Sequence, residues 1–323
     1  MRTKSEAINQ MNAWGASKTP FLFFTDFLGE QIWLRPLAEV DPAELSYNFN
    51  GITNSESPAN DTGSQLKKFP VSIDTFKTAF DQVVRAINYG DSFLTNLTFQ
   101  TPIEISASLP EIYQRAQAKY KIRFQDQFAC FSPETFVTIR NHVIRSFPMK
   151  GTIDASVPDA GAVILNDPKE TAEHVTIVDL IRNDLSRIAK NVEVRKFRYL
   201  DEIKNKDGGL LQVSSEISGE LKNDWKSRLG DILFELLPAG SISGAPKPRT
   251  LEIIHEVEKH QRGFYTGVCG VFDGDALDSG VMIRFIEKRG DQLFYKSGGG
   301  ITAFSQMQKE YQEYLDKIYV PIS

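Results

Sequence analysis

The sequence is poor in cysteine, in histidine and in clusters of positive charge, and each shortage excludes a class of protein. The two cysteines among 323 residues, Cys130 and Cys269, lie in apolar surroundings, so neither a disulfide framework nor a cysteine-based zinc site is expected. The four histidines show no metal-binding spacing, which argues against histidine-centred catalysis. A net charge of −5 without lysine- or arginine-rich runs argues against nucleic acid as a partner.

Long apolar runs are also missing. No apolar stretch approaches the about 20 residues that cross a bilayer, and the first residues lack the apolar region of a signal peptide. We therefore expect no membrane association and a cytoplasmic location. With 41% hydrophobic and 24% charged residues, the chain has the composition of a globular protein that buries a large core.

The hydrophobic periodicity predicts hairpin-type strands mixed with separate helices. We expect the α+β class, in one large domain with mainly antiparallel sheets packed against helices. Residues 51–70, rich in Asn, Ser, Asp, Gly and Pro, are the clearest loop. We place there the boundary between a short N-terminal segment packed on the main domain, residues 1–70, and the main domain, residues 71–323.

Helix and strand positions follow from the same periodicity and from the turn residues between them. Expected helices cover 5–14, 72–89, 167–189, 225–236, 248–258 and a last segment from about residue 305. Expected strands cover 21–24, 31–34, 92–99, 128–131, 136–140, 143–147, 210–219, 268–273, 280–287 and 292–296.

Lys150 stands where an alternating strand pattern gives way to a turn, in Phe147-Pro148-Met149-Lys150-Gly151-Thr152. On so stiff a support a lysine can serve as an amine nucleophile, although a lone lysine at a turn is more often a surface residue. Glu134, in Ser132-Pro133-Glu134, is a candidate proton donor. The amine must be neutral and the acid protonated for these roles, and burial favours both states.

Two pairs of glutamates each share one face of an expected helix: Glu170 with Glu173, and Glu310 with Glu313. Each pair also has a purely structural explanation. Glu170 suits a capping position at the helix start, and Glu313 suits an exposed ion pair with Lys317. Carboxylate oxygens are nevertheless the ligands that Mg²⁺ prefers, so the two pairs together predict an oxygen cage for Mg²⁺.

Three glycines, Gly298-Gly299-Gly300, precede the last expected helix, for which Ser305 is the expected N-cap. Bare backbone N–H groups at a helix N-terminus suit an anion, although runs of glycine are often simple turns. The turn 238–247 lacks the GxxxxGK[ST] pattern of a phosphate-binding loop. Its hydroxyl groups, including that of Ser243, suit a polar ligand better.

Arg284 interrupts an apolar strand in Val281-Met282-Ile283-Arg284-Phe285. A charge in a buried strand needs a partner, and an arginine matches carboxylates bidentately. Tyr265 can add a hydroxyl group. A bound carboxylate and an internal ion pair explain the arginine about equally well.

In this combination and order, the residues resemble the motifs of the chorismate-utilising enzymes, over roughly residues 75–320. The matching elements are Gly90-Asp91 with Asn96-Leu97, Ser132-Pro133-Glu134, Pro148-Met149-Lys150-Gly151-Thr152, Lys169-Glu170-Thr171-Ala172-Glu173-His174, the segment from Val178 to Leu185, the turn from Gly240 to Lys247, Tyr265-Thr266-Gly267, Ile283-Arg284, Gly299-Gly300-Ile301, and Glu310 with Glu313 and Lys317.

The resemblance implies that residues 71–323 form a chorismate-binding catalytic domain that uses Mg²⁺. Glutamates matching Glu173 and Glu313 hold the metal in such enzymes, while those matching Glu170 and Glu310 act through water. Tyr265 and Arg284 would grip the enolpyruvyl carboxylate of the substrate. The further substrate contacts we expect are Thr152, Ser243, Gly298, Gly299, Gly300 and Lys317.

Within the family, position 150 separates the activities. A lysine there implies attack on C2 of chorismate while Glu134 protonates the departing C4 hydroxyl. Ammonia then enters at C4 and expels the lysine, which gives 4-amino-4-deoxychorismate for p-aminobenzoate and folate synthesis. Anthranilate-forming members have a small residue at position 150 and aminate C2, whereas isochorismate- and salicylate-forming members use a lysine at the position of Leu94. Gln212 replaces a family histidine tied to pyruvate elimination, which also suits C4 amination.

The resemblance further implies that ammonia comes from a separate glutamine amidotransferase subunit, because the sequence contains no Cys/His glutaminase pattern. We expect the product to stop before p-aminobenzoate and expect no feedback by tryptophan, for which the N-terminal segment carries no signature. Two alternatives remain open. One is anthranilate synthesis by C2 amination with pyruvate elimination, and the other is an inactive scaffold that docks the glutaminase.

Overall fold

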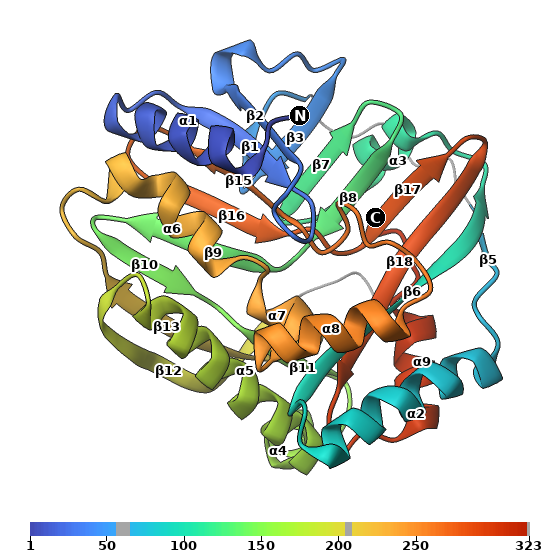
Figure 1. The fold of residues 1–323 in the computed structure, drawn as a ribbon. Helices are drawn as coiled ribbons and strands as arrows, with labels where there is room; N and C mark the ends of the chain where they lie inside the picture. The colour runs from blue at the N-terminus through green and yellow to red at the C-terminus, as the bar shows by residue number, and fades with distance from the viewer. Residues whose placement is uncertain (56–64, 204–208, 322–323) are drawn as a thin grey trace.

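The computed structural model describes residues 1–55, 65–203 and 209–321. Within these residues the strands form two sheets of nine strands each, and every strand pairing is antiparallel (Figure 1). No helix in this part of the chain is long and apolar enough to cross a lipid bilayer.

The first sheet has its strands in the order β11 (Met149–Asp154), β13 (Leu210–Glu220), β10 (Val143–Ser146), β9 (Thr135–Arg140), β16 (Leu277–Val281), β15 (Val268–Phe272), β1 (Phe21–Thr25) and β2 (Ile32–Pro36), with β12 (Lys190–Ile203) also paired to β13. The second sheet has the order β14 (Gly244–Ala245), β6 (Leu94–Ile105), β18 (Gln292–Ile301), β17 (Phe285–Arg289), β8 (Phe128–Ser132), β7 (Tyr120–Phe124), β3 (Leu45–Phe49) and β4 (Ile52–Thr53), with β5 (Leu66–Lys68) also paired to β6.

The α-helices are α1 (Lys4–Ala16), α2 (Ile73–Tyr89), α3 (Leu109–Arg115), α4 (Ala160–Asn166), α5 (Pro168–Ser186), α6 (Leu229–Leu236), α7 (Gly240–Ser243), α8 (Lys247–Val257) and α9 (Met307–Asp316). Short 3₁₀ turns cover Leu37–Glu39 and Trp225–Arg228. The helix expected over 225–236 therefore begins as a 3₁₀ turn and becomes α-helical at Leu229.

Side chains alternate between two apolar layers along the strands, which shows how the sheets are stacked. In β1, Phe23 belongs to the cluster beneath α1, α5 and α6, whereas Phe24 points the other way. Phe24 meets Phe128 of the second sheet, with ring centroids 5.4 Å apart. Phe131, on the opposite face of β8, packs into the cluster with α2, α3, α8 and α9. The molecule is thus a helix–sheet–sheet–helix sandwich, and the predicted α+β class is confirmed.

Residues before position 70 take part in both sheets. The strand β1 pairs with β15 in the first sheet, and β3 pairs with β7 in the second. The boundary expected at residue 70 falls in the short connection between the end of β5 and the start of α2.

Two of the connections that carry the chain from one sheet to the other contain predicted site residues. Between β8 and β9 the chain passes through Glu134, and between β16 and β17 it passes through Arg284. The connections lie side by side, because the Val281 N–H donates to the Glu134 carbonyl at 3.0 Å and the Phe131 N–H donates to the Arg284 carbonyl at 3.1 Å. The fold therefore brings together two residues that are 150 positions apart in the sequence.

The prediction of one strand over 280–287 is wrong. The strand ends at Val281, and a new strand begins at Phe285 in the other sheet. Arg284 lies in the break with φ of 55°, in the left-handed region that residues other than glycine rarely adopt. A hydrophobic run that crosses between two sheets has the composition of one strand, so the sequence pattern does not reveal the break.

Candidate active site

The first turn of α5 presents one half of the predicted glutamate cage. The Asp167 side chain accepts the Glu170 N–H at 2.9 Å and Pro168 opens the helix, as the sequence predicts. This cap fixes the direction of the first turn, from which Lys169, Glu170 and Glu173 project. The other half, Glu310 and Glu313, comes from α9.

The four predicted metal-binding glutamates converge on one point, and that point is occupied by an ammonium group. The Nζ atom of Lys169 lies 3.0 Å from Glu310, 3.5 Å from Glu170, 3.5 Å from Glu313 and 4.0 Å from Glu173. In the part of the chain that the structure describes, no three of these acidic groups are arranged as a closed metal site. The convergence was predicted; the central lysine was not.

Glycines of β18 and β11 make room for the carboxylates. A Cβ atom on Gly300 would lie 2.2 Å from Oε1 of Glu173, and one on Gly151 would lie 2.9 Å from Oε2 of Glu170. A Cβ on Gly299 would make ordinary contact with Glu313 at 3.4 Å. The need for glycine at position 300 is therefore a close approach by a carboxylate.

The expected anion cradle at the last helix is wrong in its local structure. The three glycines Gly298, Gly299 and Gly300 lie inside β18, paired with Thr98, Leu97 and Asn96 of β6. The helix α9 begins at Met307, with Gln306 instead of Ser305 at the N-cap. Glycine has a low strand propensity, so the sequence pattern ended the strand too early.

Burial and charge set the ionisation of this cluster. Burial alone would raise the pKa of Glu313, but Lys317 and Lys169 together lower it to about 2. Burial raises the pKa of Glu310, while the positive charge of Lys169, whose Nζ lies 3.0 Å from Oε1 of Glu310, partly opposes the change. Burial also raises the pKa of Glu170, and the nearby Lys169 only partly opposes the change.

The cluster has more acidic groups than basic ones. Four carboxylates face three ammonium groups, those of Lys150, Lys169 and Lys317. A buried group of carboxylates with more negative than positive charge is an environment that suits a hard divalent cation. The donor set therefore fits Mg²⁺, and the assignment of that metal stays a prediction.

Lys150 points from β11 into the same cluster. Its Nζ donates to Oε1 of Glu173 at 2.6 Å, and its side chain is 17% exposed. The expectation that burial leaves the Lys150 amine neutral is wrong. Burial does lower the pKa of Lys150, but attraction by Glu173, with help from Glu134 and Glu313, outweighs burial and raises the pKa.

Glu134 lies in the connection between β8 and β9, where its carboxylate accepts a hydrogen bond from the Ser241 hydroxyl. Burial raises the pKa of Glu134, while the Ser241 hydrogen bond and the positive charge of Lys150 partly oppose the change. The direction agrees with the requirements of a proton donor. Ser241 also lies in the hydroxyl-lined turn 238–247, in which the sequence predicts Ser243 as the residue that contacts the ligand.

Arg284 and Tyr265 lie in the buried region beside Glu134. Within residues 1–55, 65–203 and 209–321, the enclosed Nε atom of Arg284 has no hydrogen-bond partner, and the guanidinium lies 5.3 Å from the centre of the Tyr319 ring. Among the described residues none forms an ion pair with Arg284, so the internal ion pair considered above is absent from this part of the chain. Burial raises the pKa of Tyr265, which keeps its hydroxyl protonated.

The remaining predicted contacts differ in where they point. Lys317 bridges the Gly298 carbonyl at 2.9 Å and Glu313 at 2.6 Å, inside the cluster. Thr152 lies exposed on β11 opposite Gln212. The Ser243 hydroxyl is fully buried and donates to the Ala239 carbonyl at 2.9 Å, so it serves the turn itself.

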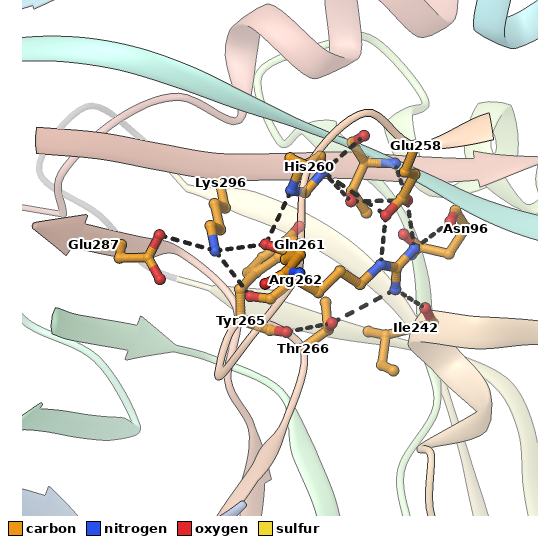
Figure 2. Close-up of polar contacts among 11 residues, drawn as sticks. Asn96, Ile242, Glu258, His260, Gln261, Arg262, Tyr265, Thr266, Glu287 and Lys296 are labelled. Atoms are coloured by element: carbon orange, nitrogen blue, oxygen red, sulfur yellow. Dashed lines mark hydrogen bonds and ion pairs between the residues drawn. The ribbon is translucent and has the colours of Figure 1, made fainter. Parts of the chain in front are cut away.

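A second buried charge cluster, absent from the sequence predictions, supports the loop that carries Tyr265 (Figure 2). Arg262 donates to both carboxylate oxygens of Glu258, at 2.9 and 2.7 Å. It also donates to the carbonyls of Ile242 and Asn96, at 2.7 Å each. Figure 2 shows these partners converging on one guanidinium from the residue that follows α8, from α7 and from β6.

Lys296 of β18 extends the same cluster from the other side. Its Nζ donates to the carbonyls of Gln261 and Arg262 at 3.0 and 2.8 Å and lies 3.1 Å from Glu287. These bonds hold two successive backbone carbonyls, those of Gln261 and Arg262, shortly before Tyr265. The Arg-Gly-Phe-Tyr stretch carries no motif that would identify such a network, because its partners come from distant elements.

Comparison with known proteins agrees with this geometry. The family model described as chorismate binding enzyme matches residues 18–323. An uncharacterized PabA-like protein of Pasteurella multocida (strain Pm70) is 46% identical over 319 residues, which are 98% of each chain. Aminodeoxychorismate synthase component 1 of Bacillus subtilis (strain 168) is 32% identical over 306 residues, which cover 90% of this chain and 61% of that protein.

Among solved structures, anthranilate synthase component I from Streptococcus pneumoniae TIGR4 superposes with a TM-score of 0.66 and 27% identity. The match covers 79% of this chain and 58% of that one. The sandwich with its buried charged site thus has the architecture of an enzyme that acts on chorismate. The chain belongs to the chorismate-binding enzyme family, on the branch that resembles component I of the chorismate-aminating synthases.

Proposed function

We propose that the protein is component I of an aminodeoxychorismate synthase, which aminates chorismate at C4 to give 4-amino-4-deoxychorismate. The observation that carries this proposal is the position of Lys150, whose Nζ lies 2.6 Å from Glu173 inside the charged cluster. A lysine at the solvent surface could not serve as a nucleophile toward a ligand held by that cluster. Its placement therefore supports the branch of the family that uses a lysine at this position.

The charged cluster supports a role in binding the metal and the ring carboxylate. Glu173 and Glu313 would hold Mg²⁺, with Glu170 and Glu310 acting through water. When bound, the metal supplies positive charge that neutralises a carboxylate of chorismate, which an acidic site would otherwise repel. Lys317, fixed by the Gly298 carbonyl, adds a further positive charge beside it.

Arg284 and Tyr265 would bind the second carboxylate of chorismate. The enclosed Nε of Arg284 has no hydrogen-bond partner among the residues that the structure describes, and an unpaired guanidinium N–H in a buried region favours an anion. The Tyr265 hydroxyl stays protonated and can donate a hydrogen bond to the same group. Two carboxylates bound at separate places orient the ring between them.

The reaction then needs a nucleophile and an acid. Lys150 releases a proton to solvent, its neutral Nζ forms a bond to C2, the ring double bond shifts, and the C4–O bond breaks. Glu134 gives its proton to the leaving oxygen, which departs as water. Ammonia next forms a bond to C4, the double bond shifts back and the bond between C2 and Lys150 breaks. The new C4 nitrogen gives one proton to the Glu134 carboxylate, which leaves a neutral amine and restores the acid.

Ammonia would come from a separate glutamine amidotransferase subunit. Two features support this part of the proposal: no Cys/His glutaminase pattern occurs in the sequence, and a relative over nearly its whole length carries the name PabA-like. The product would be a substrate for folate synthesis in the cytoplasm.

C4 amination is favoured over the other family reactions by the apolar group at position 94. Leu94 is buried, and its Cδ1 would lie 3.0 Å from a Cβ on Gly300, so an apolar side chain lies next to the glutamate cluster. Leucine cannot activate water there. The presence of Lys150 instead of a small residue argues against direct C2 amination.

The proposal is tested by identifying the product. The purified chain is incubated with chorismate, Mg²⁺ and ammonium, and the product is identified by mass spectrometry. We expect 4-amino-4-deoxychorismate. Anthranilate as the product would assign the chain to C2 amination, and no turnover, with ammonium or with an added glutaminase subunit and glutamine, would favour the inactive scaffold.

A further inference from the structure

The centre of the glutamate cluster is occupied by a lysine that the proposed reaction does not use. Lys169 lies within 4.0 Å of all four carboxylates, with its side chain 20% exposed. Lys150 and Lys317 each form a hydrogen bond to a single member, Glu173 or Glu313, at 2.6 Å. Of the cations in the described ranges, Lys169 alone forms ion pairs with all four.

The position of Lys169 excludes a second cation at the same point. Mg²⁺ binds oxygen ligands at about 2.0–2.1 Å and demands octahedral geometry. An ammonium group among the same carboxylates uses their lone pairs and repels a further positive charge. A divalent cation held by these glutamates therefore requires that the ammonium group move away.

The attachment of Lys169 allows such a movement. Its backbone is fixed at the second helical position of α5, where Asp167 caps the first turn. Its side chain is a flexible stem of four carbon atoms that ends in a point charge, and it remains partly open to solvent. The ammonium group can leave the cluster by rotation of the side chain while the helix stays in place.

We propose that Lys169 is a built-in counter-cation, which holds the four glutamates together in the metal-free protein and is displaced when Mg²⁺ binds. The inference rests on the proposed function, because that function assigns Mg²⁺ to these glutamates. Lys169 is then a positioning residue. It keeps the cage assembled before metal binds, and it weakens the metal affinity by the free energy needed to displace it.

The test is a direct measurement of Mg²⁺ binding to the full chain by calorimetry, without chorismate. We expect Lys169→Met to bind Mg²⁺ about tenfold more tightly or better, because the competing charge is gone while the length of the side chain is similar. Lys169→Arg keeps the charge and should stay close to the original affinity. Lys317→Met is the matched control, since it removes one ammonium group that pairs with Glu313 alone, and it should produce a smaller gain.

Two results would overturn the inference. One is an unchanged Mg²⁺ affinity in Lys169→Met. The other is an equal gain in Lys317→Met and Lys169→Met, which would show a general effect of charge without displacement. If neither the original chain nor any variant binds Mg²⁺, the metal assignment in the proposed function fails as well, so the two failures are distinguishable.

Thermal unfolding gives an independent readout. Without metal, Lys169→Met should melt at a lower temperature than the original chain, because four carboxylates lose their shared counter-ion. The same excess of Mg²⁺ should raise its Tm by more than it raises that of the original chain, because the stabilisation by a ligand grows with the logarithm of its affinity. If Lys169→Met folds only when Mg²⁺ is present, that dependence also supports the inference. Equal Tm shifts in the variant and the original chain would contradict it.

Discussion

The two buried charge clusters of this protein differ in how far positive charges balance the negative ones. In the Arg262 cluster, the guanidinium forms a bidentate pair with Glu258 and two further bonds to backbone carbonyls, and both side chains are 3% exposed. In the glutamate cluster, four carboxylates share three ammonium groups, those of Lys150, Lys169 and Lys317.

The difference separates a structural role from a functional one. A buried ion pair with every hydrogen bond made resists change and fixes the elements that it joins. A cluster with surplus negative charge is less stable by itself, and a cation can complete it. Both clusters adjoin one site: the first positions the loop of Tyr265, and the second carries Lys150.

The largest effect should come from removing the proposed nucleophile. Lys150→Met should lower the rate of C4 amination by about 10³-fold or more, because the step that forms the covalent intermediate is lost. Product formation by the variant, measured with chorismate, Mg²⁺ and ammonium, checks this expectation. Circular dichroism serves as the control for folding. A variant that retains the full rate would refute the role of Lys150.

The next largest effect concerns the satisfied cluster. Arg262→Met should lower the free energy of unfolding by about 3–5 kcal/mol, because Glu258 is left buried without its partner. Mg²⁺ should not restore the lost free energy of unfolding, since the Arg262 cluster has no surplus of carboxylates that could bind a metal. Denaturant unfolding with and without Mg²⁺ measures both quantities. Recovery of stability on adding Mg²⁺ would contradict the distinction between the two clusters.

The matched change in the other cluster should behave in the opposite way. Glu310→Gln removes surplus negative charge, so the metal-free protein should unfold within about 1 kcal/mol of the original. Its affinity for Mg²⁺ should fall by about 10- to 100-fold, as expected for a group that acts on the metal through water. Calorimetry and denaturant unfolding on the same sample test the pair of outcomes. A large loss of stability with unchanged affinity would reverse the assignment.

The sequence predicts those parts of the two clusters in which the interacting residues are close together along the chain. The glutamates are three positions apart on single helices, so their shared face follows from helical periodicity. The Asp167-Pro168 helix start follows from local capping preferences. These local features were predicted from sequence, and the structure has them.

The features that were missed depend on distant parts of the chain. Arg262 bonds to groups from Asn96 and Ile242, and no local pattern links these positions. The break before Arg284 depends on a second sheet that receives β17. The pKa of Lys150 depends on the exact position of Glu173, so burial alone gave the wrong direction.

A smaller effect should follow from a methyl group placed beside the glutamates. In Gly300→Ala the new Cβ would lie 2.2 Å from Oε1 of Glu173 and must displace that carboxylate. We expect about a tenfold or greater loss in amination rate and in Mg²⁺ affinity. Gly299→Ala is the control on the same strand, because its Cβ meets Glu313 at an ordinary 3.4 Å. Equal losses in both variants would show that the strand, and not the carboxylate, needs glycine.

The smallest expected effect is a shift in pH dependence. The Ser241 hydrogen bond stabilises the charged form of Glu134 and lowers its pKa, in opposition to burial. Ser241→Ala removes that bond, so the pKa of Glu134 should rise further and the acid should stay protonated to higher pH. The basic limb of the rate profile should therefore move upward. A downward shift would contradict the role of Glu134 as the proton donor.

The most direct test of the account is to look for the bond between Lys150 and the substrate. The chain is mixed with chorismate and Mg²⁺ in the absence of ammonia, quenched, and analysed by intact-protein mass spectrometry and peptide mapping. We predict an adduct with the mass of chorismate less one water molecule, carried by the peptide that contains Lys150 and absent from Lys150→Met. Turnover with ammonium by a chain that never forms this adduct, or an adduct that persists in Lys150→Met, would contradict the account.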